Sequence, residues 1–338
     1  MKILTIETLK ELLQKHGIEN YLRDLTDRLK YDFSHWEEFQ MMPRPAMHVP
    51  GGVLELMPVC SKEYFTYKYV NCHPKNIEQG LMTVVATGQL ARIDTGYPVL
   101  ASEMTILTAL RTAATTAMVT DYMARKNAKV LAIIGTGAQS EFLTKAISLV
   151  RDITEVRFFD IDVGAMDKFE KNFENAKFTL VRGRDAEEAV RGADIITVCT
   201  ACRAHVDVIK NEWVKDGVHI NGLGGDSAGK TELDVSILDR ARIVVEYFDQ
   251  SIIEGEIQRW KKDNVRDHVH EIHELINRTY TARENDSDIT LYDSVGIGLE
   301  DYSALMLTNE LLEKYGLGGE VNLIPEQTDP KDLIGVLK

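Results

Sequence analysis

The chain has 338 residues, of which 44% are hydrophobic and 27% are charged, a composition typical of a globular protein with about two domains. Its 39 basic and 53 acidic residues give a net charge of −14, which argues against nucleic acid or an anionic membrane as the main partner. No apolar run reaches the roughly 18 residues that a membrane-spanning helix needs. Acidic residues interrupt the N-terminal segment, so we expect no signal peptide. Four cysteines do not make a disulfide framework, so we expect a cytoplasmic protein.

The first third of the chain is predicted to form a helix, then strands, then another helix. Leucines recur among charged residues over residues 4–30 and predict an amphipathic helix. Strand-like runs then occupy residues 53–58, 64–71, 81–87, 90–94 and 97–101. Small and apolar residues predict a long helix over residues 102–126. Because the strands follow one another without intervening helices, we expect an antiparallel sheet or a partial barrel.

From residue 130 onward, the predicted strands and helices alternate. Strands are predicted at residues 130–134, 155–160, 178–181, 194–200, 219–223 and 242–245, with helices at 141–150, 163–175 and 185–192 between the first four. This alternation predicts a doubly wound parallel sheet. Residues 251–280 are predicted to form a charged helix, and a helix over residues 305–315 is expected to return the chain to the first domain.

The most informative stretch is Val130-Leu-Ala-Ile-Ile-Gly-Thr-Gly-Ala-Gln-Ser140, a predicted strand that ends in a glycine turn before a helix. In a dinucleotide-binding turn, Gly135 would make the turn and Gly137 would let the backbone approach a pyrophosphate at the helix N-terminus. Ser140 stands in the place of the third glycine. Asp160 ends the next predicted strand, where an acid that binds a ribose is expected. We therefore predict a nucleotide site, with an ordinary glycine turn as the alternative.

Three charged residues lie among neighbours that indicate burial or a pocket. Arg111 lies in the predicted helix among alanines and threonines, so we expect it to be covered and paired rather than solvated. Glu55 and Lys68 each share a predicted strand face with hydrophobic neighbours, because alternate residues of a strand point the same way. From spacing alone, these two charges either line a pocket or face water.

A glycine-rich loop over residues 222–233 closes the predicted strand 219–223, and such loops bind ligands in α/β sheets. Asp226 in this loop is either a candidate general base or a turn-forming aspartate. Residues 224–231 also match the P-loop pattern, but Asp226 would put a carboxylate where backbone amides should cradle phosphates. The P-loop is therefore the less favoured alternative.

Two further patterns are interpreted as structural. Cys199 and Cys202 have the spacing of a redox motif, but they follow a strand predicted to be buried rather than beginning an exposed helix. His268, His270 and His273 lack an evident cysteine or carboxylate partner at ligand spacing, so we predict a charged helix surface and no metal site.

Four segments together resemble the ornithine cyclodeaminase/mu-crystallin family over nearly the whole chain. They are residues 80–88, 102–114, 135–140 and 221–233. The loop at residues 224–233, the segment 293–302 and the C-terminal tail are most similar to the branch of the family that acts on ornithine. One departure is that Ser227 and Ala228 stand where Cys-Pro is expected.

The resemblance implies an α/β fold with two domains. Residues 119–307 would form a Rossmann domain, a doubly wound parallel sheet that binds NAD. Residues 1–118 and 308–338 would form a split α+β domain for substrate binding and dimerisation. The expected assembly is a homodimer.

The resemblance also implies a role for each matching residue. On the substrate side, Arg44, Lys68 and Arg111 would hold the α-carboxylate, Glu55 an amine, and Asp226 would be the general base, with Met57 and Val295 near the substrate. On the nucleotide side, beside Gly135 and Gly137, the implied contacts are Thr83, Ala138, Gln139, Asp160, Thr200, Asn221, Leu223, Lys230 and Ser294. An acid at Asp160 binds a ribose 2′-hydroxyl and repels a 2′-phosphate, so we predict NAD rather than NADP.

The activity that the resemblance implies is a lyase reaction in proline biosynthesis and in ornithine and arginine catabolism. L-Ornithine becomes L-proline and ammonia, and a hydride moves from the substrate to NAD and back. The alternatives are a lysine cyclodeaminase, a ketimine reductase, an amino-acid dehydrogenase, or a non-catalytic NAD(P)H-binding protein such as mu-crystallin.

Overall fold

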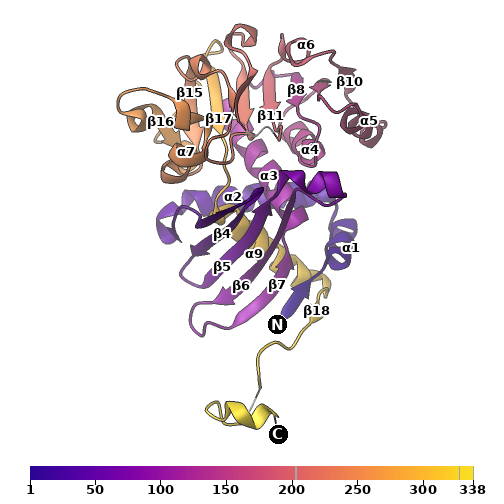
Figure 1. The fold of residues 1–338 in the computed structure, drawn as a ribbon, viewed down its shortest axis with the longest axis vertical. Helices are drawn as coiled ribbons and strands as arrows, with labels where there is room; N and C mark the ends of the chain where they lie inside the picture. Colours follow the sequence, from indigo (N-terminus) through magenta and orange to yellow (C-terminus); the bar gives the residue numbers. More distant parts are fainter. Residues whose placement is uncertain (202–203, 327, 338) are drawn as a thin grey trace.

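The computed structural model describes residues 1–201, 204–326 and 328–337, and it contains two large β-sheets (Figure 1). One sheet lies in the lower half of Figure 1 and the other in the upper half, with α2 (Ile18–Ser34) and α3 (Thr105–Met123) between them. The C-terminal segment extends away from the lower half. In the described part of the chain, no helix is long and apolar enough to cross a membrane.

The lower sheet has eight strands in the order β18-β1-β7-β6-β5-β4-β2, with β3 paired to β4. Its strands are β1 (Lys2–Leu4), β2 (Gln40–Met41), β3 (Ala46–Val49), β4 (Gly52–Cys60), β5 (Tyr64–Cys72), β6 (Val84–Arg92), β7 (Pro98–Glu103) and β18 (Gly319–Glu320). Apart from the parallel pair β1 and β7, its pairs are antiparallel, as predicted. The prediction of separate strands at 81–87 and 90–94 was wrong, because β6 continues through Gly88. A glycine is needed at this place in the strand, since a Cβ there would lie 2.9 Å from the Met104 side chain.

The predicted N-terminal helix is two helices, α1 (Ile6–His16) and α2. Gly17 separates them with a φ of 86°, a conformation that glycine adopts readily and that ends α1. Leu9 of α1 and Leu22 of α2 are both buried, so the amphipathic pattern was correct and the break was missed.

The upper sheet is parallel throughout, in the order β10-β9-β8-β11-β13-β17-β15-β16. Its strands are β8 (Val130–Ile134), β9 (Glu155–Phe159), β10 (Thr179–Arg182), β11 (Ile195–Val198), β13 (His219–Gly222), β15 (Ala241–Val245), β16 (Val269–Glu271) and β17 (Ile289–Asp293). The helices α4 (Ser140–Val150), α5 (Val163–Asn172) and α6 (Ala186–Val190) connect the first four of them. The doubly wound parallel sheet is thus confirmed, although the prediction missed β16, β17 and the separate pair β12 (His205–Ile209) and β14 (Thr231–Leu233).

The segment predicted as one charged helix over residues 251–280 is broken into short elements. They are α7 (Phe248–Glu254), the 3-10 helices Glu256–Arg259 and Val265–His268, β16, and α8 (Ile272–Ile276). α7 ends at Gly255, and the Asp293 carboxylate accepts hydrogen bonds from the backbone N–H groups of Glu256 and Ile257. A continuing helix needs those N–H groups for its own carbonyls. The prediction was wrong because a buried carboxylate far along the chain competes for them.

Two long helices join the sheets. α3 leads from the lower sheet to β8, and α9 (Gly298–Tyr315) leads from β17 back to the lower sheet (Figure 1). The expected domain boundaries after residues 118 and 307 fall inside these two helices. One cluster of buried hydrophobic residues runs from Leu9 and Leu110 to Leu143 and Tyr292, so the two halves pack directly on each other.

Candidate active site

The lower sheet carries two charged side chains on its buried face. Glu55 and Met57 of β4 are buried, whereas Leu56 between them is exposed. Lys68 of β5 is 1% exposed and lies opposite Met57 in the strand pairing, next to exposed Tyr69. The predicted alternation is confirmed, and both charges point inward rather than toward water.

Acidic residues in the first turn of α9 pair with two of the predicted substrate-binding cations. The Lys68 ammonium lies 2.9 Å from the Asp301 carboxylate, and the Arg111 guanidinium contacts Glu300 and lies 3.2 Å from Asp301. Burial, together with the charge of Arg111, lowers the pKa of Lys68 to about 8. Burial likewise raises the pKa of Glu300 to about 8. The prediction that Arg111 is covered and paired is confirmed.

Arg44 lies where the lower sheet meets the loops of the upper sheet. Its guanidinium contacts Glu254, lies 3.3 Å from the Glu55 carboxylate and donates a 2.9 Å hydrogen bond to the backbone carbonyl of Asp226. The backbone N–H of Arg44 donates to the side-chain oxygen of Gln250 at 2.7 Å. One cation thus connects β4, α7 and the glycine-rich loop.

The loop after β17 lies against Arg111. Gly296 has a φ of 78°, and a Cβ there would lie 2.5 Å from a guanidinium nitrogen of Arg111. The buried Glu246 carboxylate accepts hydrogen bonds from the Ser294 hydroxyl and from the backbone N–H groups of Val295 and Gly296. These contacts bring the predicted residues Ser294 and Val295 next to Arg111.

The glycine-rich loop holds Asp226 between Arg44 and Lys230. Asp226 is exposed, and the Lys230 ammonium lies 2.9 Å from its Oδ1 atom and 3.4 Å from the backbone carbonyl of Thr200. Strand β14 follows this loop, where a P-loop requires a helix, so the P-loop alternative is wrong.

Three carboxyl groups are buried beneath the glycine-rich loop. Burial raises the pKa of Glu232 to about 7, that of Glu256 to about 8 and that of Asp293 to about 7. The Glu256 carboxylate accepts hydrogen bonds from the backbone N–H groups of Glu232 and Leu233, and Asp293 accepts from Glu256 in the same way. These hydrogen bonds hold the backbone at Glu232, Leu233 and Glu256, next to the loop that carries Asp226.

The glycine turn after β8 has the geometry of a pyrophosphate site. Gly135 has a φ of 94°, and a Cβ there would lie 2.8 Å from the carbonyl oxygen of Cys199, so the turn requires glycine. A Cβ at Gly137 would meet no atom within 4 Å, so its backbone faces open space before α4. Ser140, in place of a third glycine, is fully buried and donates to the carbonyl of Gly137. The N-terminus of a helix, with its backbone N–H groups and the positive end of its dipole, favours an anion.

Asp160 follows β9 and points toward the same turn. Its carboxylate accepts hydrogen bonds from the backbone N–H groups of Thr136 at 2.6 Å and of Asp162 at 2.9 Å. Because each carboxylate oxygen has two lone pairs, these bonds orient Asp160 and still leave it able to accept ribose hydroxyls. The residues of this turn fit a dinucleotide of the NAD type.

Most of the other predicted nucleotide contacts lie in loops of both sheets. Ala138 and Gln139 precede α4, Thr200 and Leu223 follow β11 and β13, and Thr83 precedes β6. Asn221 differs, because its side chain is fully buried and its amide is hydrogen-bonded to Thr120, Thr197 and His219. Its contact with the nucleotide stays a prediction.

The Cys199 thiol has the surroundings of a structural cysteine. It donates to the backbone carbonyl of Gly135 at 3.2 Å, and burial raises its pKa far above the ordinary value. A thiol that stays protonated is a poor nucleophile, which favours the structural interpretation. Cys202, the other member of the pair, lies outside the described residues.

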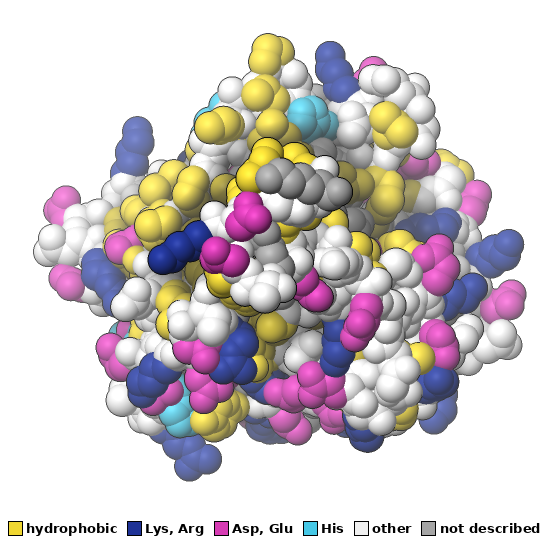
Figure 2. Space-filling view, turned by 90° about the horizontal axis from the view of Figure 1, so that it is seen from below, with side chains coloured by type: hydrophobic (Ala, Val, Ile, Leu, Met, Phe, Trp, Pro, Cys, Tyr) yellow, Lys and Arg dark blue, Asp and Glu magenta, His cyan; other side chains and the backbone are white. Residues whose placement is uncertain are grey.

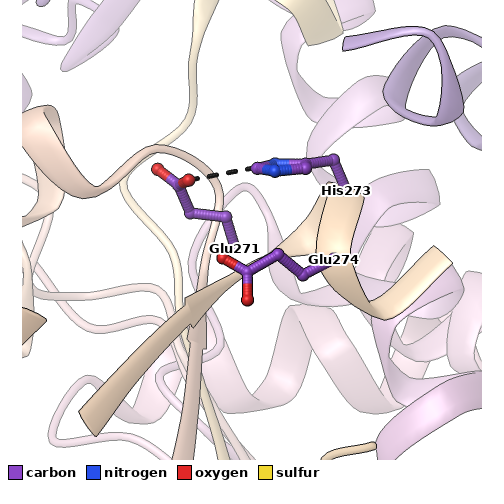
Figure 3. A group of neighbouring side chains, drawn as sticks. All are labelled: Glu271, His273 and Glu274. Carbon is purple, nitrogen blue, oxygen red and sulfur yellow. Dashed lines mark ion pairs between the residues drawn. The ribbon is translucent and has the colours of Figure 1, made fainter. Parts of the chain in front are cut away.

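Glu271, His273 and Glu274 are close enough to one another to hold a metal ion (Figure 3). Figure 3 shows Glu271 where β16 ends and the other two residues on α8. The His273 ring lies 3.9 Å from the Glu271 carboxylate. The Arg266 guanidinium lies 3.1 Å from Glu271 and 3.8 Å from Glu274, and the His273 ring stacks on Trp36. Arg266 pairs with both carboxylates, so the group is an ion-pair cluster, and the expectation that His273 lacks a carboxylate neighbour was wrong.

The sequence reasoning missed the acids that partner the predicted cations. Glu300 and Asp301 lie within the family-like segment 293–302. Two adjacent acids in an otherwise largely apolar helix are a signal that could have identified them. Glu254 gave no such signal, since it is 210 positions from Arg44. Glu232 and Glu246 were missed because only the fold buries them against loops.

Comparison with known proteins agrees with this geometry. The model of the ornithine cyclodeaminase/mu-crystallin family matches residues 7–315. An ornithine cyclodeaminase from Brucella abortus is 43% identical over 334 residues, which cover 99% of this chain and 92% of that protein. An archaeal alanine dehydrogenase dimer with bound NAD has a TM-score of 0.88 and 33% identity, covering 96% of this chain and 99% of the other.

A second solved structure, a lysine cyclodeaminase that recognises L-lysine, L-ornithine and L-2,4-diaminobutyric acid, has a TM-score of 0.89 and 26% identity over 98% of each chain. These relatives share the whole chain rather than the nucleotide-binding half alone. The chain belongs to the ornithine cyclodeaminase/mu-crystallin family.

Proposed function

We propose that this protein is an ornithine cyclodeaminase, which converts L-ornithine to L-proline and ammonia with NAD as a catalytic cofactor. The observation that carries the proposal is the position of Asp226. It lies between Arg44 on the substrate side and Lys230, which reaches Thr200 beside the glycine turn. The Brucella relative at 43% identity is named for the same activity, which supports ornithine as the substrate.

On the substrate side, we assign Arg44, Lys68 and Arg111 to the α-carboxylate of ornithine. Guanidinium groups bind carboxylates through paired, charge-assisted hydrogen bonds. Buried carboxylates hold each of these cations in place, so their positions are set before the substrate binds. We assign Glu55 to a substrate amine, and Met57 and Val295 to the apolar part of its side chain.

NAD, when bound at the glycine turn, supplies the acceptor and the donor of the hydride that leaves the α-carbon and returns. Asp226 takes a proton from the reacting amine or relays it through water. The three cations and Glu55 hold both ends of the substrate, so the δ-nitrogen is kept within reach of the oxidised α-carbon. Attack by that nitrogen expels ammonia and closes a five-membered cyclic imine, which becomes proline when the hydride returns to the same carbon.

We assign the nucleotide to residues 135–140, to Asp160 and to the loops that carry Thr83, Thr200, Leu223, Lys230 and Ser294. The Asp160 carboxylate would bind the ribose 2′-hydroxyl and repel a 2′-phosphate, so NAD is the expected form. The dehydrogenase with a TM-score of 0.88 has NAD bound, which supports this choice.

We also propose a cytoplasmic homodimer, with residues 1–118 and 308–338 as the dimerisation and substrate domain and residues 119–307 as the NAD domain. The outer face of the lower sheet exposes Leu56, Phe65, Tyr69 and Val85, each at least 36% exposed. Hydrophobic side chains are also grouped on part of the surface seen from below (Figure 2). Apolar surface of this kind marks an interface, and the archaeal relative is a dimer.

The test is an incubation with ¹³C-labelled L-ornithine and substoichiometric NAD⁺, followed by NMR. We expect labelled proline in excess of the cofactor, because the hydride returns and NAD⁺ is regenerated. NADH that accumulates without proline would assign the protein to the dehydrogenases. A parallel incubation in which labelled lysine is cyclised and ornithine is not would identify a lysine cyclodeaminase.

A further inference from the structure

The two glycines before Asp226 pack against buried carboxyl groups. A Cβ at Gly224 would lie 1.5 Å from the Oε2 atom of Glu232, and a Cβ at Gly225 would lie 2.6 Å from the Oε1 atom of Glu256. Neither glycine has a positive φ, so the requirement here is for space rather than for an unusual backbone conformation. The backbone that carries Asp226 therefore rests directly on Glu232 and Glu256.

Glu232 is fully buried on β14 and held at both ends. Its backbone N–H donates to the Glu256 carboxylate at 2.8 Å, and the backbone N–H of Glu256 donates to Asp293 at 2.8 Å. The Thr200 hydroxyl donates to Oε1 of Glu232, while Oε2 has no hydrogen-bond partner within the described ranges. The side chain is thus wedged between the end of β11 and Gly224.

Lys230 connects Glu232 to Asp226 electrostatically. Its ammonium lies 2.9 Å from Oδ1 of Asp226 and 3.4 Å from the backbone carbonyl of Thr200. Although burial opposes it, the charges of Asp226 and Glu232 raise the pKa of Lys230, so both acids act on one cation. A change at Glu232 can therefore reach Asp226 through the packing on Gly224, and Thr200 contacts both Glu232 and Lys230.

We propose that Glu232 is a positioning residue for Asp226, holding the backbone of residues 224–226. The inference rests on the proposed function, in which Asp226 is the general base. Glu232 has no contact with the substrate in this assignment. Its loss should therefore slow turnover more than it weakens binding.

Glu232→Gln keeps the volume of the side chain and an acceptor for Thr200 but removes the acid. We expect kcat for ornithine to fall about 10- to 100-fold, because small misplacements of a catalytic group have effects of this size. KM for ornithine and Kd for NAD should change less than about twofold. Hydrogen exchange of the amides at residues 224–230, measured without ligands, should become faster. An unchanged kcat together with unchanged exchange would overturn the proposal.

A double-mutant cycle tests the packing itself. Gly224→Ala places a methyl group on Glu232 and should lower kcat. Gly319→Ala controls for the added methyl group, because Gly319 also lacks a positive φ and its Cβ would make only an ordinary 3.5 Å contact with Ile3. Gly224→Ala with Glu232→Ala relieves the clash, so the double variant should be no slower than Gly224→Ala alone. If the fold-decreases in kcat of Gly224→Ala and Glu232→Ala multiply in the double variant, the proposal is overturned.

The two hypotheses fail in different ways. If the wild-type protein makes no proline, the proposed function fails, and the exchange of residues 224–230 still reports whether Glu232 holds the loop. If the wild type makes proline and Glu232→Gln matches it in kcat and in exchange, only the inference fails.

Discussion

Lys68 and Asp301 form a buried ion pair, with 2.9 Å between ammonium and carboxylate and 233 positions between them in the chain. Both side chains are 1% exposed. The pair ties β5 to the first turn of α9. It therefore links the substrate-side cations to the helix that returns the chain to the lower sheet.

Asp301→Asn should destabilise the fold strongly, because Lys68 would stay buried beside Arg111 with its main counter-charge removed. Breaking a buried pair in this way costs about 3 kcal/mol or more. Urea denaturation measures the loss. Asp167→Asn, which removes a surface partner of Arg182, is the control and should have a much smaller effect. An equal decrease in the free energy of unfolding in the two variants would contradict the prediction that the buried pair contributes more than the surface pair.

Asp226→Asn should lower kcat for ornithine by about 100-fold or more, because an amide cannot accept the proton. The affinity for NAD should stay within about twofold, since the glycine turn that would bind the pyrophosphate is untouched. Steady-state kinetics and a fluorescence titration with NADH provide the two measurements. Asp216→Asn, a surface acid that pairs with Arg240, is the matched control. Wild-type kcat in Asp226→Asn would remove Asp226 from the role of base.

Asp160→Ser should narrow the preference for NAD over NADP, because the charge that repels a 2′-phosphate is lost. The ratio of the two dissociation constants is the quantity to measure. Asp162→Ser serves as the control, since Asp162 lies two residues away and accepts hydrogen bonds from the first N–H groups of α5. If the ratio moves equally in both variants, Asp160 is not the ribose acid.

Gly296→Ala should raise KM for ornithine, because the new methyl group would displace the Arg111 guanidinium from its place. The residue also has a positive φ, so backbone strain must be separated from the clash. Gly316→Ala provides that control: it has a φ of 62°, its added methyl group would meet no atom within 4 Å, and it ends α9 away from the site. A similar KM in the two variants would show that strain alone is responsible.

His219→Gln should make stability less sensitive to acid. Burial, with the nearby charge of Arg283, lowers the pKa of His219 to about 3, whereas an unfolded histidine titrates near 6.5. Between these values the unfolded state binds a proton that the folded state does not, so the free energy of unfolding falls as the pH falls through this range. The wild type should lose up to about 1.4 kcal/mol per pH unit more than the variant. Denaturation at pH 7, 6 and 5 tests this, with exposed His48→Gln as the control; parallel slopes would contradict it.

Local chemistry in the sequence determined much of the upper half. The apolar run of β8, the turn at Gly135 and Gly137 and the acid at Asp160 are close in the chain, so their geometry follows from backbone preferences. The alternation of side chains around Glu55 and Lys68 could also be predicted from the sequence, because successive residues of a strand point to opposite faces.

Only the tertiary structure decided the partners of the charges. Lys68 with Asp301 and Arg44 with Glu254 join residues more than 200 positions apart, and no local pattern encodes such a meeting. The prediction of a helix over residues 251–280 was wrong for the same reason. Asp293, on the distant strand β17, accepts hydrogen bonds from backbone N–H groups within that segment. Backbone conformation is set mainly by neighbours in the chain. The pairing of buried charges depends on which elements the folded core brings together, because a charge removed from water must find a partner wherever the fold provides one.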